Sequence, residues 1–182
     1  MTDLKRFRLL LLMAVVTSLT VAMTACNDDD DSSISVNFML QDESGCEKYI
    51  FKEGENIIFQ LDITNKTEET ADLPNMSDMF NKEFFHVFSS KGEDYGYPYD
   101  CFYIDDCLGP FMLPANYTYT FLCPWINNPD FELPWEQPPF CFFNFFSIEK
   151  FRPLPKGEYY SKTSIRLDKK RIVSFQKSFI IE

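Results

Sequence analysis

The sequence is poor in the residues on which most enzymes and metalloproteins depend. It has a single histidine, His86, and six glycines in 182 residues. Six scattered glycines form neither a phosphate loop nor a dinucleotide fingerprint, and no G-x-S-x-G elbow is present. Without a C-x-x-C pair or a second histidine, the chain also lacks a zinc-binding pattern. We therefore expect no enzyme, no metal and no cofactor, and we interpret His86 as a structural histidine.

Basic residues are also scarce. The chain has 17 Lys and Arg against 28 Asp and Glu, a formal net charge of −11. Nucleic-acid binding requires clustered basic side chains. After residue 25 the one such cluster, Lys169-Lys170-Arg171, falls where a hairpin turn is expected. We interpret this cluster as a solvated turn and expect no nucleic-acid partner.

The N-terminal apolar stretch is too short to span a membrane. Residues 9–25 are uncharged but threonine-rich, and a spanning helix needs about 20 apolar residues. The stretch follows the basic residues Lys5, Arg6 and Arg8. This organisation predicts a secretory signal peptide over residues 1–25.

The signal peptide ends at Met23-Thr24-Ala25-Cys26, where small residues precede a cysteine. This segment resembles the lipobox read by lipoprotein signal peptidase. The resemblance implies that Cys26 is acylated and becomes the first residue of the mature protein, which two or more acyl chains hold at a membrane. An ordinary secretory signal cut after Ala25 is the alternative.

Residues 26–33 join the lipidated cysteine to four consecutive aspartates, which predict an extended, self-repelling tether. An acidic run in this position resembles the export signal of Bacteroidota-type surface lipoproteins, which implies an outer-membrane location facing the cell exterior. Without residues 1–25 the chain keeps 14 basic and 27 acidic residues, a formal net charge of −13. A calcium site is a weaker interpretation, because the aspartates are not interleaved with a glycine turn and a closing glutamate.

The mature chain favours strands, because its 20 Phe and nine Tyr suit half-buried pleated surfaces. Period-two alternation predicts seven or eight strands. They cover residues 34–40, 49–51, 57–63, 84–89, 97–104, 117–123, 159–167 and 172–181. The last two form a predicted hairpin, whereas 68–82 is expected to be irregular. This pattern predicts an all-β sandwich, a single domain over residues 34–182.

The segment Leu154-x-x-Gly157-x-Tyr159 has the spacing of a tyrosine corner. Together with Phe51-x-x-Gly54-Glu55, Leu113-Pro114 and Trp125, it gives an order of motifs similar to that of immunoglobulin-like lipoproteins of gut Bacteroidota. The same order more faintly resembles BsuPI-type proteinase-inhibitor domains. The resemblance covers roughly residues 49–167 and implies an immunoglobulin-like antiparallel β-sandwich. Its motifs are structural and carry no functional residues across.

Five cysteines stay after Cys26 is acylated, so at least one thiol is unpaired. Export permits disulfides. We expect Cys101 to pair with Cys107 and Cys123 to pair with Cys141, although two bridges among five cysteines can also be drawn in other ways.

Residues 124–153 form an aromatic and proline-rich insertion that is too aromatic for a disordered segment. Its rings either cover an open end of the sandwich or stay exposed as a platform for a sugar or a protein. In the second interpretation Trp125 and Trp135 are the candidate ligand-binding residues.

These observations predict a membrane-anchored, surface-exposed lipoprotein with a non-enzymatic binding or adhesion role toward a glycan or a host protein. Two alternatives belong to other classes of protein. One is a proteinase inhibitor, and the other is a structural accessory subunit of an outer-membrane complex.

Overall fold

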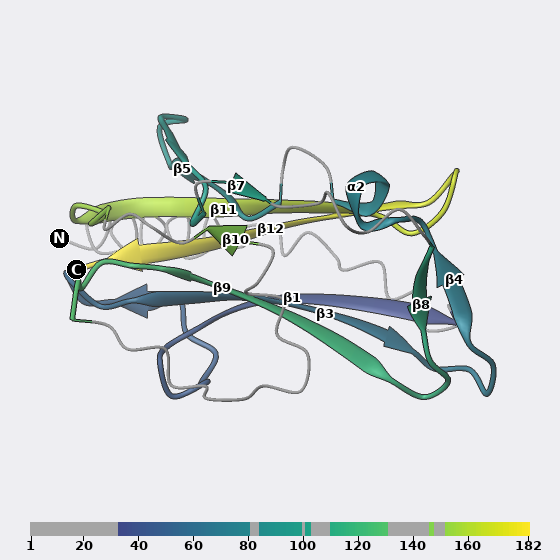
Figure 1. The fold of residues 1–182 in the computed structure, drawn as a ribbon. Coiled ribbons are helices and arrows are strands. Elements are labelled where there is room, and N and C mark those ends of the chain that lie inside the picture. The colour runs from purple at the N-terminus through teal and green to yellow at the C-terminus, as the bar shows by residue number, and fades with distance from the viewer. Residues whose placement is uncertain (1–32, 81–83, 100, 103–109, 131–145, 148–151) are drawn as a thin grey trace, which may run out of the picture. The chain divides into compact units, whose positions relative to one another are not determined.

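The computed structural model describes residues 33–80, 84–99, 101–102, 110–130, 146–147 and 152–182 (Figure 1). Apart from the short helix α2 (Met76–Met79), the elements in these ranges are strands. The longer strands are β1 (Ile34–Gln41), β3 (Ile57–Asn65), β9 (Thr118–Trp125), β11 (Gly157–Arg166) and β12 (Ile172–Ile181). The shorter strands are β2 (Ile50–Phe51), β4 (Ala71–Leu73), β5 (His86–Ser89), β6 (Asp94–Gly96), β7 (Cys101–Phe102), β8 (Phe111–Leu113) and β10 (Phe146–Ser147).

The antiparallel sheet β1-β3-β9 follows from the alternation in its sequence. Phe38 of β1 pairs with Leu61 of β3, and Leu61 pairs with Phe121 of β9. All three side chains are fully buried. Because successive side chains of a strand point to opposite faces, an apolar residue at every second position fixes this register. Pro124 is tolerated in β9 because this strand lies at the edge of the sheet.

The second large sheet has the order β2-β12-β11-β5-β6. Its centre is the β11-β12 hairpin, whose pairing runs from Gly157 opposite Ile181 to Arg166 opposite Ile172. In the turn, Asp168 Oδ1 accepts hydrogen bonds from the backbone N–H groups of Lys170 (2.6 Å) and Arg171 (2.8 Å). The predicted hairpin is confirmed, and the basic cluster occupies its turn.

The two large sheets form separate layers in Figure 1. Phenylalanine rings connect them. The ring centroid of Phe38 in β1 lies 5.6 Å from that of Phe85, which precedes β5, and 6.4 Å from that of Phe175 in β12. Phe59 of β3 also lies 5.6 Å from Phe85. Full burial of such a side chain contributes roughly 1.5–3 kcal/mol. The described part is therefore all-β with several sheets, an arrangement compatible with the predicted sandwich.

Strand β5 begins later than predicted because of Phe85. This residue has a φ of 59°, in the left-handed region that bulky side chains rarely adopt. Its N–H donates to Thr163 Oγ1 at 3.1 Å. In a regular strand Phe84 and Phe85 would point to opposite faces, yet both are buried in the core. The left-handed backbone conformation of Phe85 allows both rings to reach the core. The regular strand therefore starts only at His86.

Two small sheets were not predicted. Strand β4 pairs with β8, and β7 pairs with β10. The expectation that residues 68–82 are irregular is wrong at β4 and α2, since elements of three or four residues are too short to show a periodicity. Of the strand predicted over residues 97–104, the structure pairs Cys101–Phe102, whereas residues 103–104 lie outside the described ranges.

The tyrosine corner is confirmed. The Tyr159 hydroxyl donates to the carbonyl oxygen of Pro155 at 2.6 Å. The Tyr159 ring is buried and stacks on Phe179 with centroids 5.4 Å apart. The pKa of Tyr159 is raised to about 12, mainly by burial and secondly by the neighbouring Tyr95. This contact fixes the start of β11 and therefore the side chains that follow on its outer face.

Candidate functional site

The outer face of the five-stranded sheet carries three successive cross-strand rows of side chains. The first row joins His86 of β5, Lys162 of β11 and Gln176 of β12. The second joins Asp94 of β6, Phe88, Tyr160 and Ser178. The third joins Glu158, Ile180 and Ile50 of β2. The outer face of an antiparallel sheet is usually polar, so the aromatic and aliphatic members of these rows are unusual.

The rings of this face are in contact with one another. The centroid of His86 lies 4.2 Å from that of Phe88 and 4.2 Å from that of Tyr97. Phe88 and Tyr160 stack at 5.3 Å with an interplanar angle of 19°. We call His86, Phe88, Tyr97 and Tyr160 the aromatic row. All four are half-buried, so each ring keeps part of its surface in contact with solvent.

Charged side chains flank the aromatic row. The ammonium group of Lys162 lies 5.5 Å from the ring centroid of Phe88 and 5.6 Å from that of Tyr160. Asp94 Oδ1 accepts hydrogen bonds from His86 Nε2 and from the backbone N–H of Gly96, both at 2.7 Å. These hydrogen bonds lower the pKa of Asp94, and the bond from His86 has the largest effect. The carboxylate is therefore ionised at neutral pH, and its side chain is 60% exposed.

An open pocket of about 280 Å³ adjoins the aromatic row at Tyr160. The exposed large hydrophobic side chains of the described residues are five, and three of them line this pocket. These are Tyr49 (41% exposed), Ile50 (51%) and Ile180 (38%). Glu158, Tyr160 and Ser178 complete its outward-facing wall. We call this the apolar pocket.

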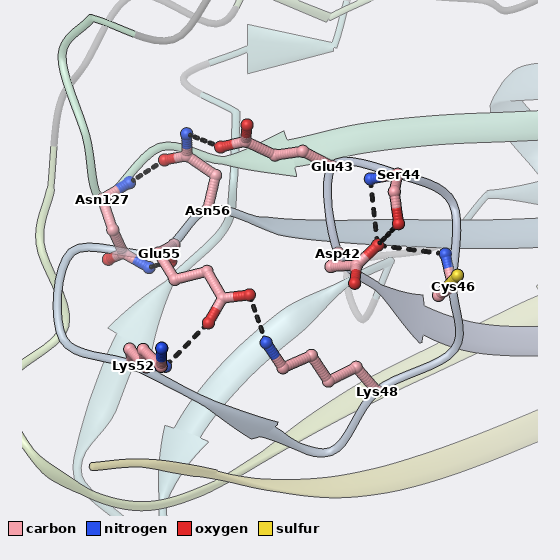
Figure 2. A network of polar contacts seen from close by, with 9 residues as sticks. All are labelled: Asp42, Glu43, Ser44, Cys46, Lys48, Lys52, Glu55, Asn56 and Asn127. Carbon is pink, nitrogen blue, oxygen red and sulfur yellow. Dashed lines mark hydrogen bonds and ion pairs between the residues drawn. The ribbon is translucent and has the colours of Figure 1, made fainter.

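The loops on both sides of β2 hold Tyr49 and Ile50 in the pocket wall. Figure 2 shows the polar contacts of these loops. Lys48, before β2, forms an ion pair with Glu55, after β2, and the other oxygen of Glu55 accepts the backbone N–H of Lys52 at 2.8 Å. Asp42 closes the preceding turn by accepting the backbone N–H groups of Ser44 and Cys46. The two-residue strand is therefore fixed by its flanks.

Two buried asparagines extend this network to distant parts of the chain (Figure 2). Asn56 Oδ1 accepts the backbone N–H groups of Asn127 (2.7 Å) and Asn128 (2.8 Å), and Asn56 Nδ2 donates to Glu43 at 2.6 Å. Asn127 Nδ2 in turn donates to the carbonyl oxygen of Glu55, and Asn127 Oδ1 accepts the N–H of Leu154. The loops around β2, the end of β9 and the approach to β11 are thus held together.

Of the two interpretations of the rings in residues 124–153, burial holds for Trp125, which therefore does not present its ring to a ligand. Trp125 is 2% exposed and belongs to the hydrophobic core. Its Nε1 donates to the carbonyl oxygen of Arg152 at 2.7 Å, because a buried indole N–H needs an acceptor. Trp135, the other candidate, lies outside the described residues, as does Cys26.

The cysteine predictions have different outcomes. Cys123 carries a free thiol that faces the core and is fully buried. Burial raises the pKa of this thiol. Because the Cys123 thiol is free, the expected disulfide with Cys141 is not present. Cys141 and Cys107 lie outside the described residues. Cys101 lies in β7, and its pairing with Cys107 stays a prediction.

Catalytic chemistry is not evident in the described part of the chain. There, His86 contacts Asp94 and aromatic rings, and no hydroxyl or thiol bonds to it. No group of three or more His, Cys, Asp or Glu in the described ranges could hold a metal ion. A search of the same ranges finds no helix that is both long and apolar enough to cross a membrane.

The aromatic row and the apolar pocket were missed by sequence reasoning, although one signal pointed to them. Tyr159 and Tyr160 are adjacent in a strand, so only one of them can face the core.

Comparison with known proteins assigns no function to this site, since the chain matches no protein-family model, no curated protein and no solved structure.

Proposed function

We propose that the chain is an exported lipoprotein, anchored in the outer membrane through Cys26, whose domain binds a glycan or a host protein at the cell surface without catalysis. The anchor is supported by the lipobox-like Met23-Thr24-Ala25-Cys26 and by the acidic residues after it. Two acyl chains give stable attachment, because each buried methylene contributes about 0.8 kcal/mol.

We further propose that the domain is immunoglobulin-like. Two facing sheets, antiparallel except for the β2-β12 pair, and the Tyr159 corner support this assignment. The parallel pairing of β2 with β12 at one edge is also compatible with an edge strand that changes sheets. In such domains, outer sheet faces and loops are available to partners.

The binding role rests on one observation, the exposed apolar pocket beside the aromatic row. Large contiguous apolar patches mark contact sites, and three of the five exposed large hydrophobic side chains of the described residues gather at this pocket. Ile50 and Ile180 pair directly across β2 and β12, so their exposure is concentrated at one place. Aromatic rings next to this pocket offer faces on which a sugar or a peptide can pack.

The test is a screen of the purified full chain on glycan and protein arrays. A double variant, Ile50→Ser with Ile180→Ser, removes the apolar wall at positions already exposed to water. Ile172→Ser is the matched control, because Ile172 is 52% exposed on the same strand as Ile180 but eight positions away. We expect the double variant to lose at least about tenfold in affinity, which corresponds to roughly 1.4 kcal/mol, and the control to bind as the wild type does.

Absence of detectable binding by the wild-type chain on both arrays would contradict the binding role. Equal binding by the double variant and the wild type would contradict its placement at the apolar pocket. Slowed hydrolysis by a serine protease in the presence of the chain would favour the inhibitor alternative. Capture of a stable outer-membrane complex with no array ligand would favour the accessory subunit.

A further inference from the structure

The ring pair Phe88 and Tyr160 already holds a cation in this structure. Lys162 places its ammonium group within 6 Å of both ring centroids, at 5.5 and 5.6 Å, the range in which ring faces attract positive charge. Lys162 and Tyr160 are two positions apart on β11 and share its outer face. The lysine is therefore an intramolecular occupant of an aromatic surface.

Carboxylates stand on both sides of this ring pair. Asp94 pairs with Phe88 across β5 and β6, and both hydrogen bonds that it accepts fall on Oδ1, which leaves Oδ2 without a donor among the described residues. Glu158 is exposed two positions before Tyr160, in the wall of the apolar pocket, and no described cation pairs with it. The surface thus offers two ring faces and two carboxylates beside Lys162, and one of these carboxylates, Asp94, is also bonded to His86.

We propose that this surface binds a basic segment of a partner protein, with an arginine or lysine side chain of the partner taking the place of Lys162 over Phe88 and Tyr160. The proposal rests on the proposed function and specifies its ligand. A partner cation gains the ring faces together with Asp94 and Glu158, and the mature chain, with a formal net charge of −13, attracts a basic partner at long range. A neutral sugar would have to displace Lys162 without any charge to compensate.

The experiment measures binding of a fluorescent peptide of alternating glycine and arginine to the full chain in detergent. The same peptide with citrulline in place of arginine is the neutral control probe. Lys162→Met vacates the rings, and Lys66→Met removes the same charge from the loop after β3, on the other sheet. We expect Lys162→Met to tighten binding at least about threefold, Lys66→Met to have a smaller effect, and the citrulline peptide to bind more weakly than the arginine peptide.

A third variant separates ring contact from net charge. Phe88→Leu with Tyr160→Leu keeps apolar volume and removes the π faces, so in this background Lys162→Met should no longer tighten binding beyond Lys66→Met. Equal effects of the two lysine variants in the wild-type background, or equal affinity for the citrulline peptide, would overturn the proposal. So would binding of a neutral glucose hexasaccharide in place of the arginine peptide.

The experiments distinguish failure of the basic-partner proposal from failure of the proposed function. If the arginine peptide does not bind but an array ligand is lost on Ile50→Ser with Ile180→Ser, the binding role stands and only the basic partner is refuted. If no array ligand is found and the peptide does not bind, both are refuted.

Discussion

At the scale of single residues, Tyr159 connects a local motif to the stability of the whole domain. Its hydroxyl donates to Pro155 O at 2.6 Å and its ring is buried against Phe179. One such hydrogen bond contributes on the order of 1 kcal/mol. The same environment keeps the phenol in its neutral form, so Tyr159 contributes to the response of the domain to alkaline pH, as do Tyr49 and Tyr99, whose pKa values are also raised by burial.

We predict that Tyr159→Phe lowers the free energy of unfolding by about 1 kcal/mol at neutral pH and flattens the alkaline part of the stability profile. The folded-state pKa of about 12 lies above the unfolded value near 10. The contribution of the neutral phenol is therefore fully present below pH 10 and is lost as the pH rises through 12. Urea unfolding between pH 7 and 12 measures both effects.

Tyr160→Phe is the matched control for this prediction, since among the described residues the hydroxyl of Tyr160 donates no hydrogen bond. It should leave the free energy of unfolding at neutral pH unchanged. An identical pH profile for Tyr159→Phe and the wild-type chain would show that Tyr159 does not govern the alkaline response.

At the scale of elements, the position of the two-residue strand β2 depends on Asn56 rather than on the length of its ladder. Asn56 accepts two backbone N–H groups, from Asn127 and Asn128, and donates to Glu43. A strand this short pairs with β12 at only two positions. The apolar pocket therefore keeps its wall because loops on either side of β2 are tied to the end of β9.

We predict that Asn56→Ala lowers the free energy of unfolding by about 2–3 kcal/mol, because it leaves the buried N–H of Asn127 without an acceptor. Asn37→Ala, on the exposed face of β1, should change it by less than about 0.5 kcal/mol. Chemical denaturation of the two variants beside the wild-type chain measures the difference. Equal stabilities of Asn56→Ala and Asn37→Ala would refute this role of Asn56.

The long elements were predictable from sequence, and the short ones were not. In β3, buried and half-buried residues alternate from Phe59 to Asn65, and the apolar residues at every second position are enough to identify a strand. In β4 three residues give no period, and the pairing with β8 depends on contacts distant in sequence. Phe85 could not be foreseen either, since a positive φ in a phenylalanine depends on the surrounding core.

The candidate site was less predictable than the fold. Aromatic content drew attention to Trp125, but a tryptophan is as well suited to a core as to a ligand platform, and here the core holds it. The outer face of the five-stranded sheet is composed of residues from β2, β5, β6, β11 and β12. Only the order of strands brings Ile50 beside Ile180 and Phe88 beside Tyr160, and alternation alone does not give that order.

At the scale of the whole molecule, we propose a lipid anchor at Cys26 followed by a β-domain whose outer sheet face binds a partner. Residues 26–33, with four consecutive aspartates, lie between these two parts in the sequence. The outer-face proposals thus have their biological setting only if Cys26 carries lipid.

The most direct test of the anchor is to label producing cells with radioactive palmitate and to follow the label on the full chain. The wild-type chain and Cys46→Ser should both carry the label, because Cys46 is an exposed free thiol that serves as the matched control. Cys26→Ser should carry none. A wild-type chain without label, or a Cys26→Ser chain that keeps it, would contradict the account.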